Sequence, residues 1–147
     1  MPNLPKIQLT SLAENTMKFG EHLIFDAYKC NPKKLDDLEF CKKVLNDLVE
    51  LAKMHKLMEP YLLRADGNTV LGGKDPGGIS AFVMIEESHI SLHTFTKRGF
   101  VTLDLYSCNT FDSTGIVEYL KNAFETTDYS ILKFDRGLKY PTENIYD

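Results

Sequence analysis

Residues 79–108 constrain the fold most, because they resemble three strands in immediate succession. The runs ISAFVMI and FVTLDLYSC are strongly apolar, and HISLHTF between them alternates apolar and polar side chains. A turn at 97–99 separates the last two strands. The alternation predicts two faces, with Ile90, Leu92 and Thr94 on one and His89, Ser91, His93 and Phe95 on the other.

Two amphipathic stretches predict helices. One begins at Asn31-Pro32, a cap and first-turn pair, and its apolar positions recur at steps of three and four: Leu38, Cys41, Leu45, Leu48 and Ala52. The other is capped by Asp112 or Ser113, with Ile116, Val117, Leu120, Ala123 and Phe124 facing inward. Further strands are expected at 18–28, 61–64 and 129–134, and a glycine-rich loop without regular structure at 65–78. This order predicts an α+β fold, a two-layer α/β sandwich whose mostly antiparallel sheet carries both helices on one face.

Composition indicates one globular domain, residues 1–147, in which 43% of residues are apolar and 26% charged. A net charge of −4 gives no electrostatic footprint for nucleic acid. No run approaches the ~20 apolar residues of a membrane span. The three cysteines form no CxxC pair, which argues against a disulfide framework and against a metal site. We therefore expect a soluble, cytoplasmic protein without metal.

Residues 86–93 concentrate acids, hydroxyls and two imidazoles between apolar strands. His89 and His93 share a face and could bind a metal ion, but the sequence offers no third ligand. The same residues could instead be the solvent side of an edge strand. The residues alone leave these alternatives open.

A more specific pattern resembles a known family. Glu87-Ser88-His89, then Ile-Ser-Leu-His93-Thr, then Asp104 and Cys108, is similar to the signature of prokaryotic S-adenosylmethionine decarboxylases. The resemblance covers roughly residues 18–137, because further residues of the pattern fall in the same order: Gly20, His22-Leu23, Pro76, Gly78 and Ser80.

The resemblance implies that the chain processes itself. Ser88 would attack the carbonyl of Glu87 and cut the chain into a β chain, residues 1–87, and an α chain, residues 88–147. Ser88 would become a covalent pyruvoyl group, which forms a Schiff base with the substrate amine and acts as the electron sink for decarboxylation. No external cofactor is implied.

Three other residues take roles from the resemblance. His93 would remove the serine α-proton, Ser80 would assist processing, and Cys108 would reprotonate the product carbon. The alternative for each is packing or a place on a strand surface. Ser88 and His93 are an odd number of positions apart, so a straight strand would send their side chains to opposite faces. A bulge or a partner chain must therefore bring them together. The resemblance implies the partner: a homodimer, (αβ)2 after processing, with sites between protomers.

The nucleoside-binding positions depart from the family pattern. Lys74 stands where the family has an aromatic ring against the base, and Lys97 stands where it has a glutamate on the ribose hydroxyls. A lysine has no acceptor for those hydroxyls. We therefore expect a small-molecule substrate that is a basic amino acid, L-ornithine or L-arginine, within polyamine biosynthesis. Its cationic end would need an acidic partner among Asp75, Glu86 and Asp104.

Two alternatives stay open. A shifted loop could restore an aromatic ring from Phe19 or Tyr61, and the substrate would then be S-adenosylmethionine, for spermidine synthesis. The chain could also be an unprocessed, non-catalytic paralogue. Retention of Ser80, Ser88, His93 and Cys108 together favours an enzyme.

Overall fold

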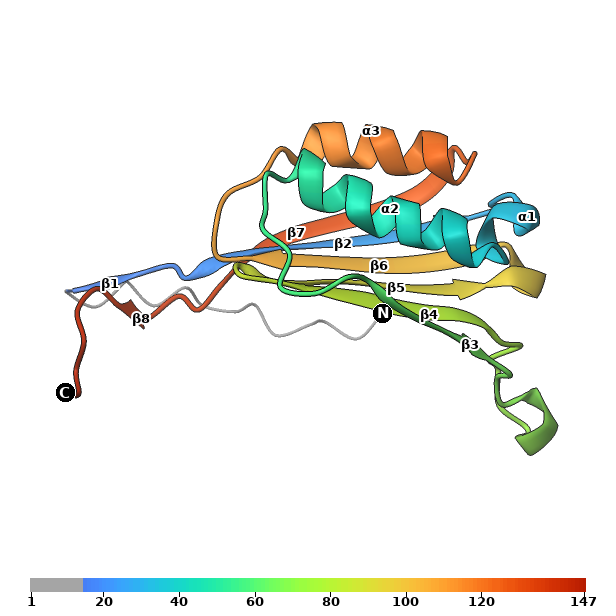
Figure 1. Ribbon diagram of the computed structural model, residues 1–147, viewed down its shortest axis with the longest axis horizontal. Coiled ribbons are helices and arrows are strands. Elements are labelled where there is room, and N and C mark those ends of the chain that lie inside the picture. Colours follow the sequence, from blue (N-terminus) through green and yellow to red (C-terminus); the bar gives the residue numbers. More distant parts are fainter. Residues whose placement is uncertain (1–14) are drawn as a thin grey trace, which may run out of the picture.

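The computed structural model describes residues 15–147, which form a six-stranded antiparallel sheet with helices on one face (Figure 1). The strands lie in the order β3-β4-β5-β6-β2-β7. Their bounds are β2 Gly20–Tyr28, β3 Tyr61–Ala65, β4 Gly78–Ile85, β5 Ser88–Phe95, β6 Phe100–Ser107 and β7 Asp128–Arg136. Two short strands, β1 (Thr16–Met17) and β8 (Tyr140–Pro141), pair with each other beyond one end of the sheet. The predicted α+β fold class is confirmed.

The first predicted helix is two helices, so the prediction of one continuous helix was wrong. Asn31 caps α1 (Pro32–Leu35) by accepting a hydrogen bond from the Lys33 N–H at 3.0 Å. The Asp37 carboxylate accepts from the Phe40 N–H at 3.0 Å and begins α2 (Leu38–Leu51). Asp side chains favour such a cap over a helix interior, which is why the chain restarts there.

The remaining helical elements are short or follow prediction. Asp112, one of the two predicted caps, accepts from the Gly115 N–H at 3.1 Å and begins α3 (Ser113–Ala123). The predicted turn at 97–99 is the 3-10 helix η2 (Thr96–Arg98), which ends at Gly99. A second 3-10 turn, η1 (Thr69–Leu71), lies in the loop predicted to lack regular structure, which corrects that expectation.

The core fills the space between the sheet and the two longer helices (Figure 1). The predicted faces of β5 are confirmed, because Ile90, Leu92 and Thr94 are no more than 2% exposed. No helix among residues 15–147 covers the opposite face, which we call the open face. Strand alternation gives that face a set of exposed apolar side chains: Tyr61, Leu63, Phe82, Met84, Leu132 and Phe134.

One buried hydroxyl joins the sheet to the first helix. The Thr94 Oγ1 donates to the Leu35 carbonyl at 2.7 Å and accepts from the Ile79 N–H at 2.9 Å. Gly78 approaches the same residue so closely that a Cβ there would lie 1.9 Å from the Thr94 carbonyl oxygen. The polar residue at this core position therefore satisfies two backbone groups.

Thr94→Val should lower the free energy of unfolding by about 2–4 kcal/mol, because it leaves a buried donor and a buried acceptor unpaired. Thr94→Ser keeps the hydroxyl and should lose less. Thr96→Val is the matched control, since the Thr96 hydroxyl makes no hydrogen bond with the described residues. Urea unfolding of the three variants measures the effect. An unchanged midpoint for Thr94→Val would contradict the assignment.

Candidate active site

The predicted cleavage bond lies in the tight turn between β4 and β5. Ser88 has a φ of 146°, a backbone conformation that residues with a side chain rarely adopt. The carbonyl oxygen of Glu87 accepts a hydrogen bond from the Cys108 N–H at 2.9 Å. Antiparallel pairing causes this contact, because Ser88 lies opposite Ser107 and Cys108 follows directly. We call Glu87, Ser88 and Cys108 the turn cluster.

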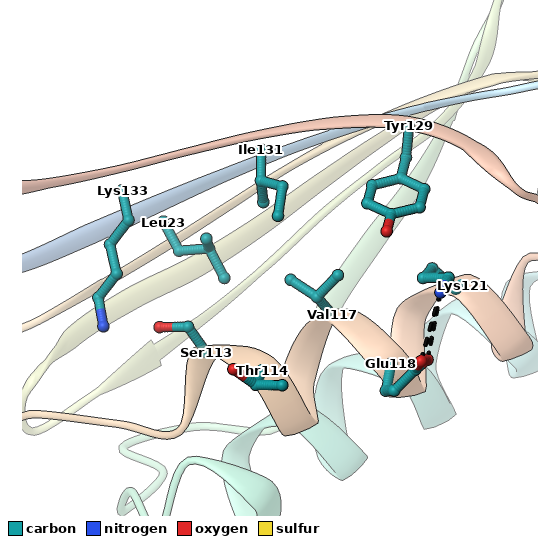
Figure 2. Close-up of a pocket in the computed structure, with 9 residues that line it drawn as sticks. All are labelled: Leu23, Ser113, Thr114, Val117, Glu118, Lys121, Tyr129, Ile131 and Lys133. Carbon is teal, nitrogen blue, oxygen red and sulfur yellow. Dashed lines mark hydrogen bonds and ion pairs between the residues drawn. The ribbon is translucent and has the colours of Figure 1, made fainter.

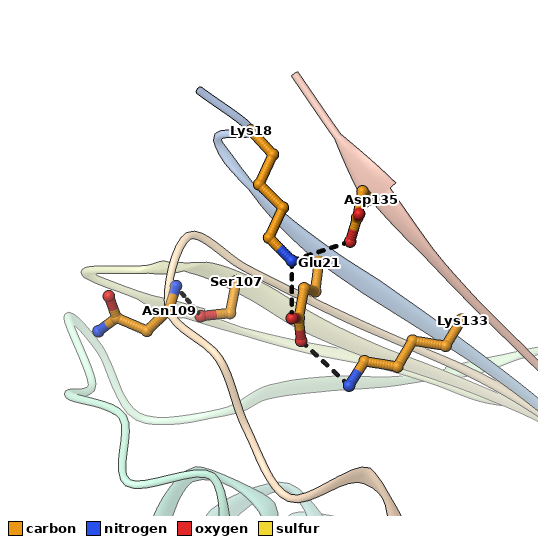
Figure 3. Close-up of polar contacts among 6 residues, drawn as sticks. All are labelled: Lys18, Glu21, Ser107, Asn109, Lys133 and Asp135. Atoms are coloured by element: carbon orange, nitrogen blue, oxygen red, sulfur yellow. Dashed lines mark hydrogen bonds and ion pairs between the residues drawn. The ribbon is translucent and has the colours of Figure 1, made fainter. Parts of the chain in front are cut away.

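Gly20 lies directly against the backbone of Ser107 and Cys108. A Cβ on Gly20 would lie 2.2 Å from the Ser107 carbonyl oxygen and 2.9 Å from the Cys108 Cα. The Ser107 hydroxyl in turn accepts from the Asn109 N–H at 2.9 Å (Figure 3). Only a glycine permits β2 to approach this strand end so closely.

Glu21, next in the chain, is a buried acid that sequence reasoning missed. It is 8% exposed and lies between Lys18 at 3.1 Å and Lys133 at 3.0 Å, while Lys18 also contacts Asp135 (Figure 3). Burial would raise the pKa of Glu21, but hydrogen bonds from the two lysines lower it below its usual value. Glu21 lies two residues before Leu23 and four before Phe25 in the same strand, so all three side chains point to one face. This alternation could have placed Glu21 on the buried face.

The three cysteines differ in environment. Cys30 and Cys41 are buried, and burial raises the pKa of their thiols to about 11 and about 12. Such thiols are almost fully protonated near neutral pH and are therefore unreactive. Cys108 is partly exposed and lies beside the predicted cleavage bond.

Ser80 and His93 form a second group on the open face. They lie opposite each other on β4 and β5, and the Ser80 Oγ is 3.0 Å from the His93 Nδ1. We call them the hydroxyl–imidazole pair. Five positions of extended strand separate Ser88 from His93, roughly 16 Å at about 3.3 Å per residue. A single chain therefore brings the predicted site residues together as two separate groups.

One chain does not gather the three predicted substrate-binding residues. Lys74 and Lys97 are exposed and lie near the end of the sheet where β4 begins. A pocket of about 350 Å³ there is lined by Lys97 together with Asp36, Arg64 and Asp66, among others. Phe19 lies at the opposite end, where its ring packs on Tyr106 and, edge-on, on Tyr140.

The three candidate acids for a cationic substrate have different surroundings. Asp104 lies on the open face with 34% of its side chain exposed, and the His22 Nε2 donates to it at 2.8 Å. Arg136 donates to the His22 Nδ1 at 3.3 Å, which sets this tautomer because arginine has no acceptor. Asp75 accepts from the Gly77 N–H within its loop, and Glu86 is exposed on the β4–β5 turn.

Another pocket lies on the helix side of the sheet, between α3 and β7 (Figure 2). It measures about 380 Å³, and Leu23, Val117 and Ile131 point into it. It contains none of the predicted site residues, so the candidate chemistry does not involve it.

Residues 15–147 offer neither a cluster of metal ligands nor a helix that could span a membrane. No three His, Cys, Asp or Glu side chains in this part of the chain gather closely enough to hold a metal ion. No helix within it is long and apolar enough to cross a bilayer.

The architecture places the chain in a known class of two-layer α+β proteins. It superimposes on the crystal structure of the adenosylmethionine decarboxylase from Aquifex aeolicus with a TM-score of 0.67, over 87% of this chain and 98% of that one. The two sequences are 23% identical, so this likeness shows a shared fold.

Sequence relatives then define the family. The profile of the S-adenosylmethionine decarboxylase family matches residues 21–137. The S-adenosylmethionine decarboxylase proenzyme of Thermodesulfovibrio yellowstonii is 32% identical over 120 residues, which are 81% of this chain and 82% of that protein. Proenzyme 2 of Bacillus cereus is 29% identical over 121 residues, 82% of this chain and 90% of the relative. The chain belongs to the S-adenosylmethionine decarboxylase family, which confirms the resemblance.

Proposed function

We propose that this protein is a self-processing, pyruvoyl-dependent decarboxylase that cuts itself between Glu87 and Ser88, giving a β chain of residues 1–87 and an α chain of residues 88–147. The contact that carries the proposal is the hydrogen bond from the Cys108 N–H to the Glu87 carbonyl, at a turn where Ser88 has a strained backbone. The word proenzyme in the names of the relatives supports it.

The turn cluster suits an acyl shift. The Ser88 Oγ attacks the Glu87 carbonyl carbon, a C–O bond forms, and the C–N bond breaks to leave an ester and a free amine. Negative charge develops on the Glu87 oxygen, where the Cys108 N–H already points at 2.9 Å, so this donor stabilises the transition state. Cleavage also releases the backbone strain at Ser88, which is worth about 1–3 kcal/mol.

Elimination completes the processing. A base removes the α-proton of Ser88, the Cβ–Oγ bond breaks, and Glu87 leaves as a carboxylate. Water then replaces the amine nitrogen, which departs as ammonia. The pyruvoyl group so formed supplies the electron sink for decarboxylation of an amino acid. Cys108, partly exposed beside this position, is suited to return a proton to the product carbon.

The base comes from a second subunit. His93 is the candidate, held by its hydrogen bond with Ser80, but it lies five strand positions from Ser88 in the same chain. A homodimer, (αβ)2 after processing, brings the hydroxyl–imidazole pair of one chain to the turn cluster of the other. The open face is the surface for this contact, because it exposes Phe82 and Met84, among other apolar side chains, beside the pair.

The substrate is a basic amino acid, L-ornithine or L-arginine. Lys97 offers no acceptor for ribose hydroxyls, and Asp104 offers a carboxylate on the open face for a cationic end. S-adenosylmethionine is the second candidate, favoured by the names of the relatives. An unprocessed paralogue is the third candidate, and it would differ from both enzymes in leaving the bond between Glu87 and Ser88 intact.

Ser88→Ala should abolish cleavage, leaving one full-length, uncleaved chain without decarboxylase activity, because no nucleophile remains. Cys108→Ala should still be cleaved, more slowly, while kcat falls by about a hundredfold or more through loss of the proton donor. Intact-mass analysis and release of labelled carbon dioxide measure both effects. Ser130→Ala, an exposed serine on β7, is the control. Normal decarboxylation by Ser88→Ala would contradict the mechanism, and an uncleaved, inactive parent chain would favour the paralogue.

Mixed dimers test the shared site. A His93→Ala chain should remain largely uncleaved alone, but co-expression with a Ser88→Ala chain should restore cleavage of about half of it, the share in heterodimers when chains mix at random. One site of each heterodimer then holds both Ser88 and His93. A partner carrying Ser88→Ala and His93→Ala together is the control and should restore nothing. Absence of rescue by the single Ser88→Ala partner would show that the site lies within one chain.

Substrate choice is measurable with carboxyl-labelled amino acids. We expect kcat/KM for L-ornithine or L-arginine to exceed that for S-adenosylmethionine by at least about tenfold, because the site cannot pair the ribose hydroxyls. Lys97→Glu should raise kcat/KM for S-adenosylmethionine by restoring an acceptor, and Lys139→Glu, with the same charge change elsewhere, should not. A parent enzyme that prefers S-adenosylmethionine would establish the second candidate instead.

A further inference from the structure

The connection between α2 and β3 runs beside the turn that contains the predicted cleavage bond. The Leu57 N–H donates to the Met84 carbonyl at 3.0 Å, and Lys56 pairs with Ile85 as an isolated antiparallel bridge. The Glu86 N–H donates to the His55 carbonyl at 2.9 Å. Residues 55–57, which we call the flanking segment, therefore border the chain that leads to the turn.

The flanking segment holds the Glu87 side chain. The His55 Nδ1 donates to the Glu87 Oε1 at 2.6 Å, and the His55 backbone N–H donates to the Oε2 at 3.2 Å. The side chain of Glu87 is 6% exposed, so both carboxylate oxygens are paired where little water reaches them. A buried carboxylate that lost these partners would be strongly disfavoured. The pairing thus ties the Glu87 side chain to one position.

The hydrogen bond between His55 and Glu87 favours the charged form of both side chains. Burial would raise the pKa of the Glu87 carboxyl, but hydrogen bonds from the His55 side chain and backbone lower it below its usual value. The same hydrogen bond raises the pKa of His55. Both shifts favour the ionised form of each group, and hydrogen bonds between ionised groups are among the stronger ones in proteins.

Glu87 is consequently held both by its side-chain carboxylate and by its backbone carbonyl. His55 holds its side chain, and the Cys108 N–H holds its carbonyl oxygen. We propose that His55 is a positioning residue for self-cleavage, which acts through the Glu87 carboxylate to keep the Glu87 carbonyl against the Cys108 N–H and the Ser88 backbone in its strained conformation. This inference rests on the proposed self-cleavage.

A packing role does not account for His55. Its side chain is 76% exposed, so it buries little apolar surface, and its described side-chain hydrogen bond is the one to Glu87. The effect of a substitution should therefore pass through that hydrogen bond. The adjacent Lys56 gives a matched comparison, because its ammonium group contacts Asn46 and Glu59 instead.

Pulse–chase of newly translated chains, followed on a denaturing gel, measures the cleavage rate. His55→Ala should slow cleavage by about tenfold or more through loss of a charged hydrogen bond. His55→Asn should cleave within about threefold of the parent, because its amide N–H can take the place of Nδ1–H. Lys56→Ala should cleave at the parent rate. Equal thermal midpoints for Ser88→Ala with and without His55→Ala would exclude a general loss of stability.

A double-substitution cycle tests whether His55 acts through Glu87. If it does, His55→Ala should add nothing to the slowing caused by Glu87→Ala. An undiminished rate for His55→Ala, an equally slow His55→Asn, or multiplied effects in the double variant would each overturn the inference while self-cleavage stood. A parent chain that never cleaves would overturn the proposed function, and this inference with it.

Discussion

The antiparallel pairing of β5 with β4 on one side and β6 on the other determines where every candidate catalytic residue lies. Pairing with β6 puts Ser88 opposite Ser107, and so brings the Cys108 N–H to the Glu87 carbonyl. Pairing with β4 puts His93 opposite Ser80. A shift of one residue in the register of β5 would turn His93 away from the open face, toward the face where the helices pack. The buried face of β5 resists such a shift, because it would expose Ile90 and Leu92.

The same register also separates the two groups. An extended strand between Ser88 and His93 is too stiff to fold back on itself, so the proposed function places the site that contains both residues between two chains. The sheet has the surface for such a contact, since the helices cover one face and leave exposed apolar side chains on the other. In the proposed function, the extended strand between Ser88 and His93 therefore makes self-processing depend on formation of the homodimer.

Residues from two other segments of the chain lie against the turn cluster. Gly20 packs against the strand end before Cys108, Glu21 lies opposite Ser107, and the His55 side chain donates to the Glu87 carboxylate. Gly20 and Glu21 are neighbours at the start of β2, whereas His55 comes from a distant segment of the chain. Burial of Glu21 and Glu87 is tolerated because every carboxylate has a cationic or N–H partner. The strain at Ser88 persists because the surrounding structure over-determines it.

The sequence by itself determined the α+β class, the faces of β5, the cap at Asn31 and the family, and it narrowed the cap of the last helix to Asp112 or Ser113. Local periodicity and short motifs carry that information directly. It did not reveal the second cap at Asp37, because a carboxylate within an apolar period looks like a solvated helix position. It also did not reveal Glu21 or His55, whose partners are distant in the chain.

Strand alternation in the sequence already sent Ser88 and His93 to opposite faces. Only the tertiary structure paired Ser88 with Cys108 and Ser80 with His93, and separated Phe19 from Lys74 and Lys97. The order of residues in the sequence does not give the distances between them. Those distances follow from which strands pair and in which register. Contacts such as Cys108 N–H to Glu87 O depend on which strands become neighbours, and that choice is made by burial of the whole core rather than by any local pattern.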